Sequence, residues 1–489
     1  MGIPILSITL ASLAVGAAAS FVAGSRARWV ALATALVFVA ETAAMFLGAW
    51  GPALAPGQVP VGDAETYRWI SLPWLQVNYA LGVDGISLVL ILLTAFLGLA
   101  TIVYSWNESH RPGPWFGLIL LTLLGSVGVF SALDVLLFFL FWEAVLVPMF
   151  FIIGYWGGPR RRYAALKFFI YTHVASVVML VGLLVLVFYS GSTSLDYSAL
   201  VARAPALPIV TQSVVFLALL FGFGVKFPVV PFHTWLPDAH VEAPTGGSVL
   251  LAGLLLKLGG YGLIRWGILL VPGGFLHLDP IVYVLAFLSI AWGSVVALAQ
   301  RDMKRLVAYS SINHMGIVLL AIAVHSSLGL LAAVLLMFAH GVVSGLLFMV
   351  SGSVHHTFGT RDLASLGGIT PGTPFLATMI MIGSLASLGL PALVSFPAEF
   401  GALLATYVAV SYWVLIPLLI LVVTAAFYLW MMQRLLFGPP RGLPAEGAHD
   451  LPFFERAGMA VLVVPIVLFG ILPGLLVTVI ANSPIRGYP

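Results

Sequence analysis

Long apolar runs alternate with short polar connections along almost the whole chain. A helix of about 20 apolar residues crosses the hydrocarbon core of a bilayer. Fourteen such runs occur, at residues 3–23, 28–48, 83–104, 114–131, 133–154, 165–189, 211–238, 245–270, 280–299, 305–324, 328–350, 374–402, 411–436 and 456–481. The pattern predicts an all-α polytopic membrane protein with about fourteen transmembrane helices, folded as a single transmembrane domain over residues 1–489.

Prolines interrupt the seventh and twelfth runs, which are longer than one crossing needs. The seventh run contains Pro228 and Pro231, and the twelfth contains Pro391 and Pro397. Proline removes a helical hydrogen bond and clashes with the preceding turn. Membrane helices tolerate proline in general, so a single break would indicate little. Two breaks at matched positions, each beside an ionisable residue, predict that helices 7 and 12 are interrupted at a transport site.

The matched breaks also indicate an internal repeat of five helices. The first repeat covers residues of about 114–270, and the second covers about 280–436. A set with an odd number of helices re-enters the membrane with the opposite orientation, so the second repeat is predicted to be inverted. Inverted repeats with interrupted helices are typical of transporters.

Basic residues indicate how the chain lies in the membrane. If the N-terminus is outside, most of the 20 Lys and Arg residues fall in inner loops, including the cluster at 160–162. The positive-inside rule therefore predicts that both termini are outside. Segment 49–82 becomes an outer loop, expected to form a small hairpin, and segments 352–373 and 437–455 become inner linkers.

Composition supports the membrane assignment and excludes several other classes. The chain is 61% hydrophobic and 8% charged, with a mean hydropathy of +1.13, whereas soluble domains carry about 25% charged residues. It has no cysteine, which removes disulfides, thiolate zinc sites and cysteine-ligated iron–sulfur clusters. Neither a dinucleotide fingerprint nor a P-loop occurs, and the scattered basic residues do not predict nucleic-acid binding. We therefore expect no cofactor or metal in this chain.

Four charged residues lie well inside the predicted spans: Glu143, Lys226, Lys257 and Glu399. A charge at the bilayer centre costs about 2.5–3.5 kcal/mol on insertion scales, so such residues mark pathways or pair with each other. Both lysines are too deep for their side chains to reach the interface. One alternative is a fixed Glu143–Lys226 salt bridge without a transport role.

Three histidines, His173, His314 and His340, also fall inside the spans. An isolated histidine in a helix is usually packed or hydrogen-bonded, but histidines that share a membrane with buried lysines and glutamates are better explained by a proton relay. We expect that relay to continue from Lys257 through His314 and His340 to Glu399.

Lys226 is expected to carry protons as well. Glu143 is expected to control whether Lys226 keeps its proton. A lysine in a low dielectric favours its neutral form, and a nearby carboxylate stabilises the ammonium. At 4 Å and an effective dielectric of 20 that attraction is about 4 kcal/mol. Movement or neutralisation of the carboxylate would therefore release the proton. Glu41 has no predicted role.

Several stretches are those of a known family. The longest, Phe232 to Arg265, reads FHTWLPDAHVEAPTGGSVLLAGLLLKLGGYGLIR, and shorter ones are LGVDGISL from Leu81, FWEAVLVPMFFIIGYWGGPRRRYAALKFF from Phe141, DMKRLVAYSSINHMG from Asp302 and FAHGVVSGLLF from Phe338. TRDLASLGG from Thr360 matches more loosely. Over about 75–435 the chain resembles the antiporter-like M chain (subunit 4 type) of respiratory complex I, the proton-translocating NADH:quinone oxidoreductase, within the Mrp antiporter superfamily.

The resemblance implies a proton-translocating subunit of an NADH (or ferredoxin):quinone oxidoreductase, with the inverted-repeat fold of fourteen helices. It implies that Glu143, Lys226, Lys257 and Glu399 are the key translocation residues, with His314 and His340 in a central hydrophilic axis. Its expected partners are the other membrane subunits, including neighbouring antiporter-like subunits. Quinone, flavin and iron–sulfur clusters would be in partner subunits, and the complex would be in a bacterial or archaeal cytoplasmic membrane.

Glu399 bears on the alternative function, a sodium/proton antiporter subunit of the Mrp type. The M chain carries a glutamate at this place, and most related antiporter-like chains carry a lysine, so the glutamate favours the M type. The family pattern here is Gly-Phe-x-Gly-Glu-Phe, whereas this chain has Ser-Phe-Pro-Ala-Glu-Phe over 395–400. A third alternative, a structural spacer between pump subunits, has no need of buried charges.

Overall fold

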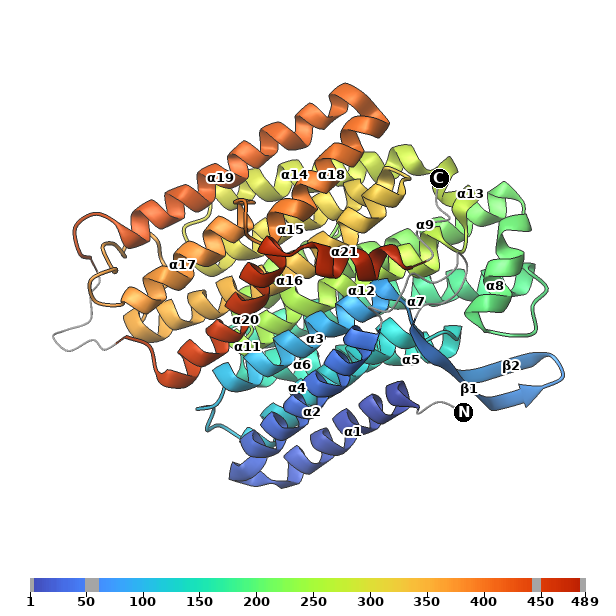
Figure 1. Ribbon diagram of the computed structural model, residues 1–489, viewed down its shortest axis with the longest axis horizontal. Coiled ribbons are helices and arrows are strands. Elements are labelled where there is room, and N and C mark those ends of the chain that lie inside the picture. The colour runs from blue at the N-terminus through green and yellow to red at the C-terminus, as the bar shows by residue number, and fades with distance from the viewer. Residues whose placement is uncertain (1–3, 49–60, 442–449, 484–489) are drawn as a thin grey trace.

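The computed structural model describes residues 4–48, 61–441 and 450–483. Among them, thirteen helices are long and apolar enough to cross a membrane. One of these segments, Ser395–Leu436, comprises α18 (Ser395–Val410) and α19 (Leu415–Leu436), which Figure 1 shows as two arms joined by a sharp turn. The predicted all-α architecture with about fourteen crossings is therefore confirmed.

The other crossing segments follow in chain order, and most lie roughly parallel in one bundle (Figure 1). They are α1 (Ile5–Val22), α2 (Ala27–Gly48), α3 (Gly85–Tyr104), α4 (Pro112–Ser131), α5 (Val135–Ala144) with α6 (Leu146–Trp156), α7 (Arg161–Tyr189), α9 (Ile209–Lys226) with α10 (Trp235–Glu242), α11 (Thr245–Leu250) continuing through α12 (Leu256–Gly262), α14 (Asp279–Leu298), α15 (Met303–Ala323), α16 (Ser327–Phe358) and α20 (Phe453–Ile471) with α21 (Gly474–Ala481). The shorter apolar helix α17 (Pro374–Ser387) precedes α18 and belongs to the same crossing. Two short helices, α8 (Tyr197–Arg203) and α13 (Pro272–His277), lie in connections.

Aspartates begin several helices at the ends of the bundle. Asp84 accepts from the Ser87 backbone N–H at 3.0 Å at the start of α3, and Asp134 accepts from Leu136 N–H at 2.9 Å at the start of α5. The first N–H groups of a helix lack helical partners, and a carboxylate satisfies them while complementing the helix dipole. Within a bilayer no water is available to accept hydrogen bonds from these N–H groups, so the capping carboxylates fix where each helix starts.

A two-stranded hairpin projects from one end of the bundle (Figure 1). Strands β1 (Val61–Leu72) and β2 (Leu75–Val83) pair antiparallel. Glu65 of β1 accepts from the backbone N–H groups of Leu6 at 2.8 Å and Ser7 at 3.1 Å, so the hairpin caps the start of α1. The hairpin predicted in segment 49–82 is confirmed, and residues 49–60 lie outside the described residues.

Contacts between connections agree with the predicted alternation of the crossings. Ladder-type contacts join Gln76 to Ser194 and Leu81 to Ala132, all in connections expected on the outer face. At the opposite end, Gly367 pairs with Arg441 in two expected inner linkers. One missed or extra helix would have placed such partners at opposite ends of the bundle.

Both predicted interruptions occur. In the seventh crossing, α9 ends at Lys226 and α10 begins at Trp235, and in the twelfth, α17 ends at Ser387 and α18 begins at Ser395. The prolines expected to break each helix lie in or beside these gaps.

Two further irregularities were not predicted. The fifth crossing is divided at Val145, between α5 and α6. In the eighth crossing, π-helical turns at Leu251–Leu255 and Leu263–Ile268 flank α12, which carries Lys257. π-Turns widen a helix locally and frequently mark functional sites.

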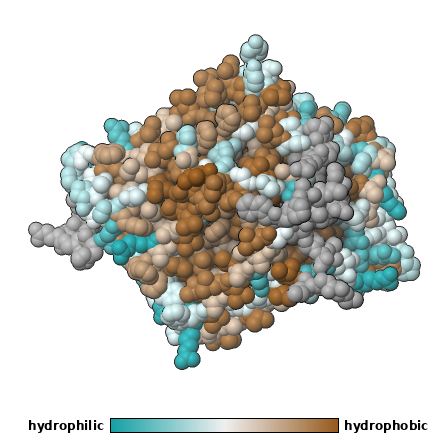
Figure 2. Space-filling view, viewed as in Figure 1, coloured by the Kyte–Doolittle hydropathy of each residue, from teal (hydrophilic) through white to brown (hydrophobic). Residues whose placement is uncertain are grey.

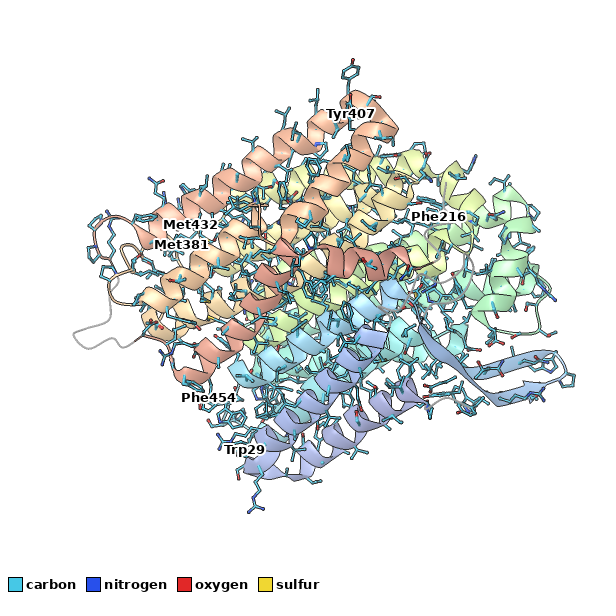
Figure 3. All side chains as sticks on the ribbon, viewed as in Figure 1. Trp29, Phe216, Met381, Tyr407, Met432 and Phe454 are labelled. Carbon is cyan, nitrogen blue, oxygen red and sulfur yellow. The ribbon has the colours of Figure 1, made fainter. Side chains whose placement is uncertain are left out.

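The surface is apolar around the bundle, as Figure 2 shows for one face. Trp29 and Phe454 lie near one end of the bundle, and Tyr407 projects from the apex of α18 (Figure 3). Trp106 joins the first two rings, at 4.7 Å from Trp29 and 4.9 Å from Phe454, between ring centroids. Aromatic clusters of this kind are enriched where helices meet the membrane interface. The eighth, tenth and eleventh crossings are in contrast almost entirely buried, and they carry the polar centre.

Candidate functional site

Lys257 is the most deeply placed charge of the bundle. Its side chain is fully buried in α12, and its Nζ lies 2.6 Å from Nδ1 of His340 on α16. The Nζ also donates to the carbonyl of Ala252, in the preceding π-turn. Among the described residues it forms no ion pair. Its described contacts are therefore a backbone carbonyl and an imidazole, with no carboxylate among them.

The neighbouring groups form a continuous line away from Lys257. The rings of His340 and His314 are 5.5 Å apart between centroids. Nδ1 of His314 is 3.4 Å from Oε1 of Glu399, and its Nε2 is 3.1 Å from Ser387 Oγ. Nε2 of His340 has no hydrogen-bond partner in the described chain. The structure therefore brings together Lys257, His340, His314 and Glu399 from three crossings and an interrupted helix.

A small cavity joins the two histidines. It has a volume of about 10 Å³, roughly the space that one water needs. His314, His340 and several hydroxyl groups line it, among them Tyr428, which donates to Ser310 Oγ at 2.9 Å. A single water there would have several polar partners.

The twelfth-helix interruption shapes the surroundings of Glu399. Gly389 in the gap has a φ of +75°, a left-handed conformation that glycine adopts without strain. A Cβ on Gly389 would collide with Oε2 of Glu399. The two glycines of the family pattern are absent beside Glu399, and the required space is supplied by Gly389, ten residues earlier in the chain.

Lys226 lies at the other interruption, as the last residue of α9. Its Nζ is 3.7 Å from the centre of the Trp142 ring and 3.4 Å from the Trp142 carbonyl, to which it donates. A helix C-terminus and an aromatic face both favour a cation. Lys226 is buried, and the described chain places no carboxylate in an ion pair with it.

Glu143 has a different partner from the one considered in the sequence. Its Oε2 is 2.8 Å from Nδ1 of His173 on α7, and its Oε1 has no hydrogen-bond partner among the described residues. The fixed Glu143–Lys226 salt bridge is therefore not present. The side chains of Glu143 and His173 are 22% and 45% exposed, so this pair lies at the edge of the bundle.

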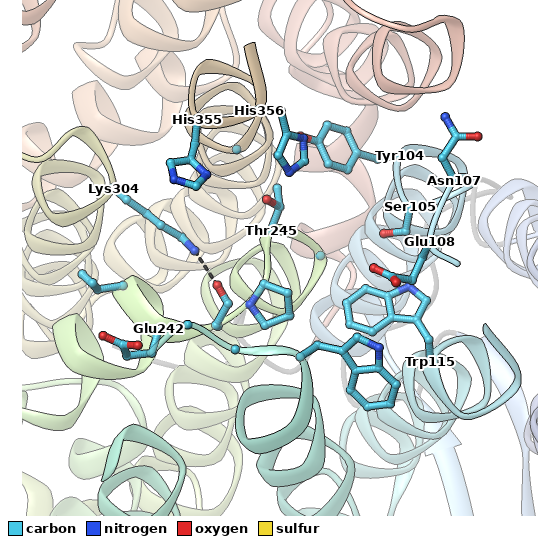
Figure 4. Close-up of a pocket in the computed structure, with 18 of the residues that line it drawn as sticks. Tyr104, Ser105, Asn107, Glu108, Trp115, Glu242, Thr245, Lys304, His355 and His356 are labelled. Carbon is cyan, nitrogen blue, oxygen red and sulfur yellow. Dashed lines mark hydrogen bonds between the residues drawn. The ribbon is translucent and has the colours of Figure 1, made fainter. Parts of the chain in front are cut away.

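A polar vestibule opens where inner connections meet. Its volume is about 740 Å³, and Figure 4 shows the side chains of Glu108, Glu242, Lys304, His355 and His356 around it. Lys304 is buried at its base and donates to the Ala243 carbonyl at 2.6 Å. The sequence had placed Lys304 in an inner loop, but as the second residue of α15 it is inside the protein.

His240 is a second residue that the sequence reasoning missed. It lies in α10, fully buried, with its ring stacked on Phe348 at 4.4 Å between centroids, and neither ring nitrogen has a partner in the described structure. It directly precedes Val241 and Glu242, which line the vestibule. It belongs to the most recognisable stretch of the chain, yet hydropathy alone gives no sign of its burial.

No group of three or more His, Cys, Asp or Glu side chains that could hold a metal ion occurs within residues 4–48, 61–441 and 450–483.

Comparison with known proteins gives consistent matches. A family model described as NADH:quinone oxidoreductase/Mrp antiporter, transmembrane, matches residues 132–427. F(420)H(2) dehydrogenase subunit M of Methanosarcina mazei is 42% identical over 86% of this chain and 85% of that protein. NADH-quinone oxidoreductase subunit M of Rhodobacter capsulatus is 39% identical over 94% of this chain and 90% of that protein.

A solved structure shares the fold over almost its full length. A chain of respiratory complex I from Thermus thermophilus superposes with a TM-score of 0.88 at 28% identity, covering 98% of this chain and 99% of that chain. Together with the family match and the identity to two M subunits, this shows that the chain belongs to the NADH:quinone oxidoreductase/Mrp antiporter membrane-subunit family, as a member of its M-chain (chain 4) type.

Proposed function

We propose that this chain is the proton-translocating M-type membrane subunit of a complex I-type oxidoreductase that passes electrons to a quinone. The observation that carries the proposal is the row of neighbouring buried groups Lys257, His340, His314 and Glu399. A buried ammonium next to a neutral imidazole, with a carboxylate at the far end, is a path for protons.

Each transfer has a defined donor and acceptor. The Lys257 ammonium gives a proton to His340 Nδ1, leaving a neutral amine and an imidazolium. His340 then releases its Nε2 proton towards the small cavity that it shares with His314. His314 passes a proton to Glu399 from Nδ1, which lies 3.4 Å from the carboxylate. Each step returns the donor to its neutral form, and rotation of the two histidine rings restores the tautomers that accept the next proton from the lysine side.

Protons would reach Lys257 from the vestibule. Lys304 is buried at its base, and the buried His240, which has two unpartnered ring nitrogens, directly precedes the vestibule residues Val241 and Glu242 in α10. Because the vestibule lies among the connections predicted to be inner, entry is from the cytoplasm. Both chain termini would then be outside, and the chain would lie in a bacterial or archaeal cytoplasmic membrane.

Lys226 and the Glu143–His173 pair lie outside this line, and we assign them the coupling to a neighbouring subunit. This pair is partly exposed at the edge of the bundle, where an uncovered carboxylate facing lipid would be costly. A neighbouring membrane subunit that covers this pair would interact with the charge of Glu143. That charge in turn changes the stability of the ammonium on Lys226. The partners are therefore the other membrane subunits, which would hold the quinone, flavin and iron–sulfur groups.

A sodium/proton antiporter subunit is the second candidate. It would use the same buried residues without redox input. Glu399 at the end of the line and the identity to M subunits of quinone and F(420)H(2) oxidoreductases favour the redox-driven pump.

Lys257→Met tests the central step. The substitution keeps the length of the side chain and removes the proton carrier, and an apolar group is tolerated at a fully buried position. We expect the complex to assemble and redox-coupled proton uptake in membrane vesicles to fall by about a hundredfold or more. Leu258→Met is the control and should pump normally. Normal pumping by Lys257→Met would refute the proposed path.

Gly389→Ala tests the position of Glu399. The added methyl group collides with Glu399 Oε2, and left-handed backbone costs alanine about 1–2 kcal/mol. Gly359→Ala is the matched control, because Gly359 also has a left-handed φ, of +70°, but an added Cβ there would have no atom within 4 Å. Both variants should lose similar thermal stability, but only Gly389→Ala should lose proton uptake. Equal uptake in the two would show that the geometry of Glu399 is not critical.

His240→Phe tests entry from the vestibule. Phenylalanine keeps the stack on Phe348 and removes both ring nitrogens. Proton uptake should slow by about a hundredfold, the scale of one lost proton-transfer group. Phe348→Leu removes the aromatic stacking on His240 but keeps its imidazole, and this variant should slow proton uptake less. If His240→Phe takes up protons at the normal rate, protons enter elsewhere.

A further inference from the structure

A groove opens at the inner end of α19, away from the buried line. Its volume is about 690 Å³, within the range of small-molecule sites. One wall is formed by the last two turns of α19 and the other by the linker at 363–367. The residues that matter below are Trp430, Arg434, Phe437, Gly367 and Arg441.

The groove is basic and its cations are free. Arg434 and Arg441 are both exposed, and within the described part of the chain neither guanidinium has an ion-pair partner. Arg434 lies over the Trp430 ring at 4.2 Å, and the Arg441 backbone N–H donates to the Gly367 carbonyl at 2.9 Å, which fixes each arginine to a different wall. No carboxylate is among the residues that line the groove.

Capping of α19 does not explain these arginines. The carbonyls at the end of the helix already accept hydrogen bonds, Leu435 from the Ile369 N–H at 3.1 Å and Leu436 from the Thr370 hydroxyl at 2.8 Å. Within the described residues, the two guanidinium groups are thus available to an anion.

An apolar row leads along α19 to the groove. Its exposed members recur at helical spacing and end one turn before Arg434: Leu415, Leu418, Leu419, Val422 and Leu429. The helix forms one edge of the bundle in Figure 1, so this row is open to lipid. Trp430 stands where the row meets the groove, a position typical of the membrane interface.

We propose that this groove binds the headgroup of an anionic phospholipid. The phosphate lies between Arg434 and Arg441, and the acyl chains follow the apolar row of α19. Arginine forks match phosphate oxygens, and basic pockets on the cytoplasmic side of membrane proteins recognise anionic headgroups. A zwitterionic lipid carries its own ammonium beside the phosphate and leaves the second arginine unmatched. The inference does not depend on the proposed function.

Lipid retention by the assembled complex tests the proposal without any pumping assay. The purified complex is equilibrated with equal amounts of dioleoyl-phosphatidylglycerol and dioleoyl-phosphatidylcholine in neutral detergent, washed, and its retained lipids are counted by mass spectrometry. Each arginine near an anionic surface changes the affinity about fivefold. We expect Arg434→Gln and Arg441→Gln each to lower phosphatidylglycerol retention by about that factor, with phosphatidylcholine unchanged. Arg26→Gln removes an exposed inner-face charge without a groove and should change neither lipid.

Three results would overturn the proposal. One is unchanged phosphatidylglycerol retention in both groove variants. Another is an equal loss in the Arg26→Gln control. A third is loss of a neighbouring membrane subunit from the variant complexes with no change in lipid, which would make the groove a protein interface. If Arg434→Gln does not assemble, Arg441→Gln decides alone, because Arg441 lies outside every helix.

Discussion

A positive charge buried in a bilayer has to be compensated or given up, and Lys257 is held where compensation is weakest. Its contacts are a backbone carbonyl and a neutral ring, with no carboxylate in the described surroundings. Two π-turns flank α12, and that carbonyl belongs to the first of them. In the proposed function, the histidines and Glu399 provide the groups to which the proton moves.

Each of the two interrupted helices places a charged residue beside the interruption. The end of α9 presents its negative dipole to Lys226, with the Trp142 ring above the ammonium. The gap before α18 places Gly389 against Glu399, in a conformation that other residues adopt only with strain. At α19 polar groups occur near the inner end of the helix, in a basic groove.

Hydropathy and proline predicted the crossings, the interruptions and the outer hairpin, because these follow from local sequence. The list of buried charges could also be predicted, since each stands alone in an apolar run. Their partners could not: Glu143 pairs with His173, which is 30 residues away, and not with Lys226. His240 and Lys304 were missed because their burial depends on packing between distant helices. The role of Gly389 was hidden for the same reason, since Glu399 approaches it only after the chain has turned at the interruption.

The most direct measurement records donor-to-quinone electron transfer and proton uptake together in membrane vesicles, with and without sodium, for the wild-type complex and for Glu143→Gln. Glutamine keeps the shape of the side chain and removes its charge, so assembly can be verified first. A redox-driven pump requires both activities to fall together in the variant, to the same extent with and without sodium. Normal electron transfer, with loss only of a sodium-dependent proton exchange, would contradict this account and identify an antiporter.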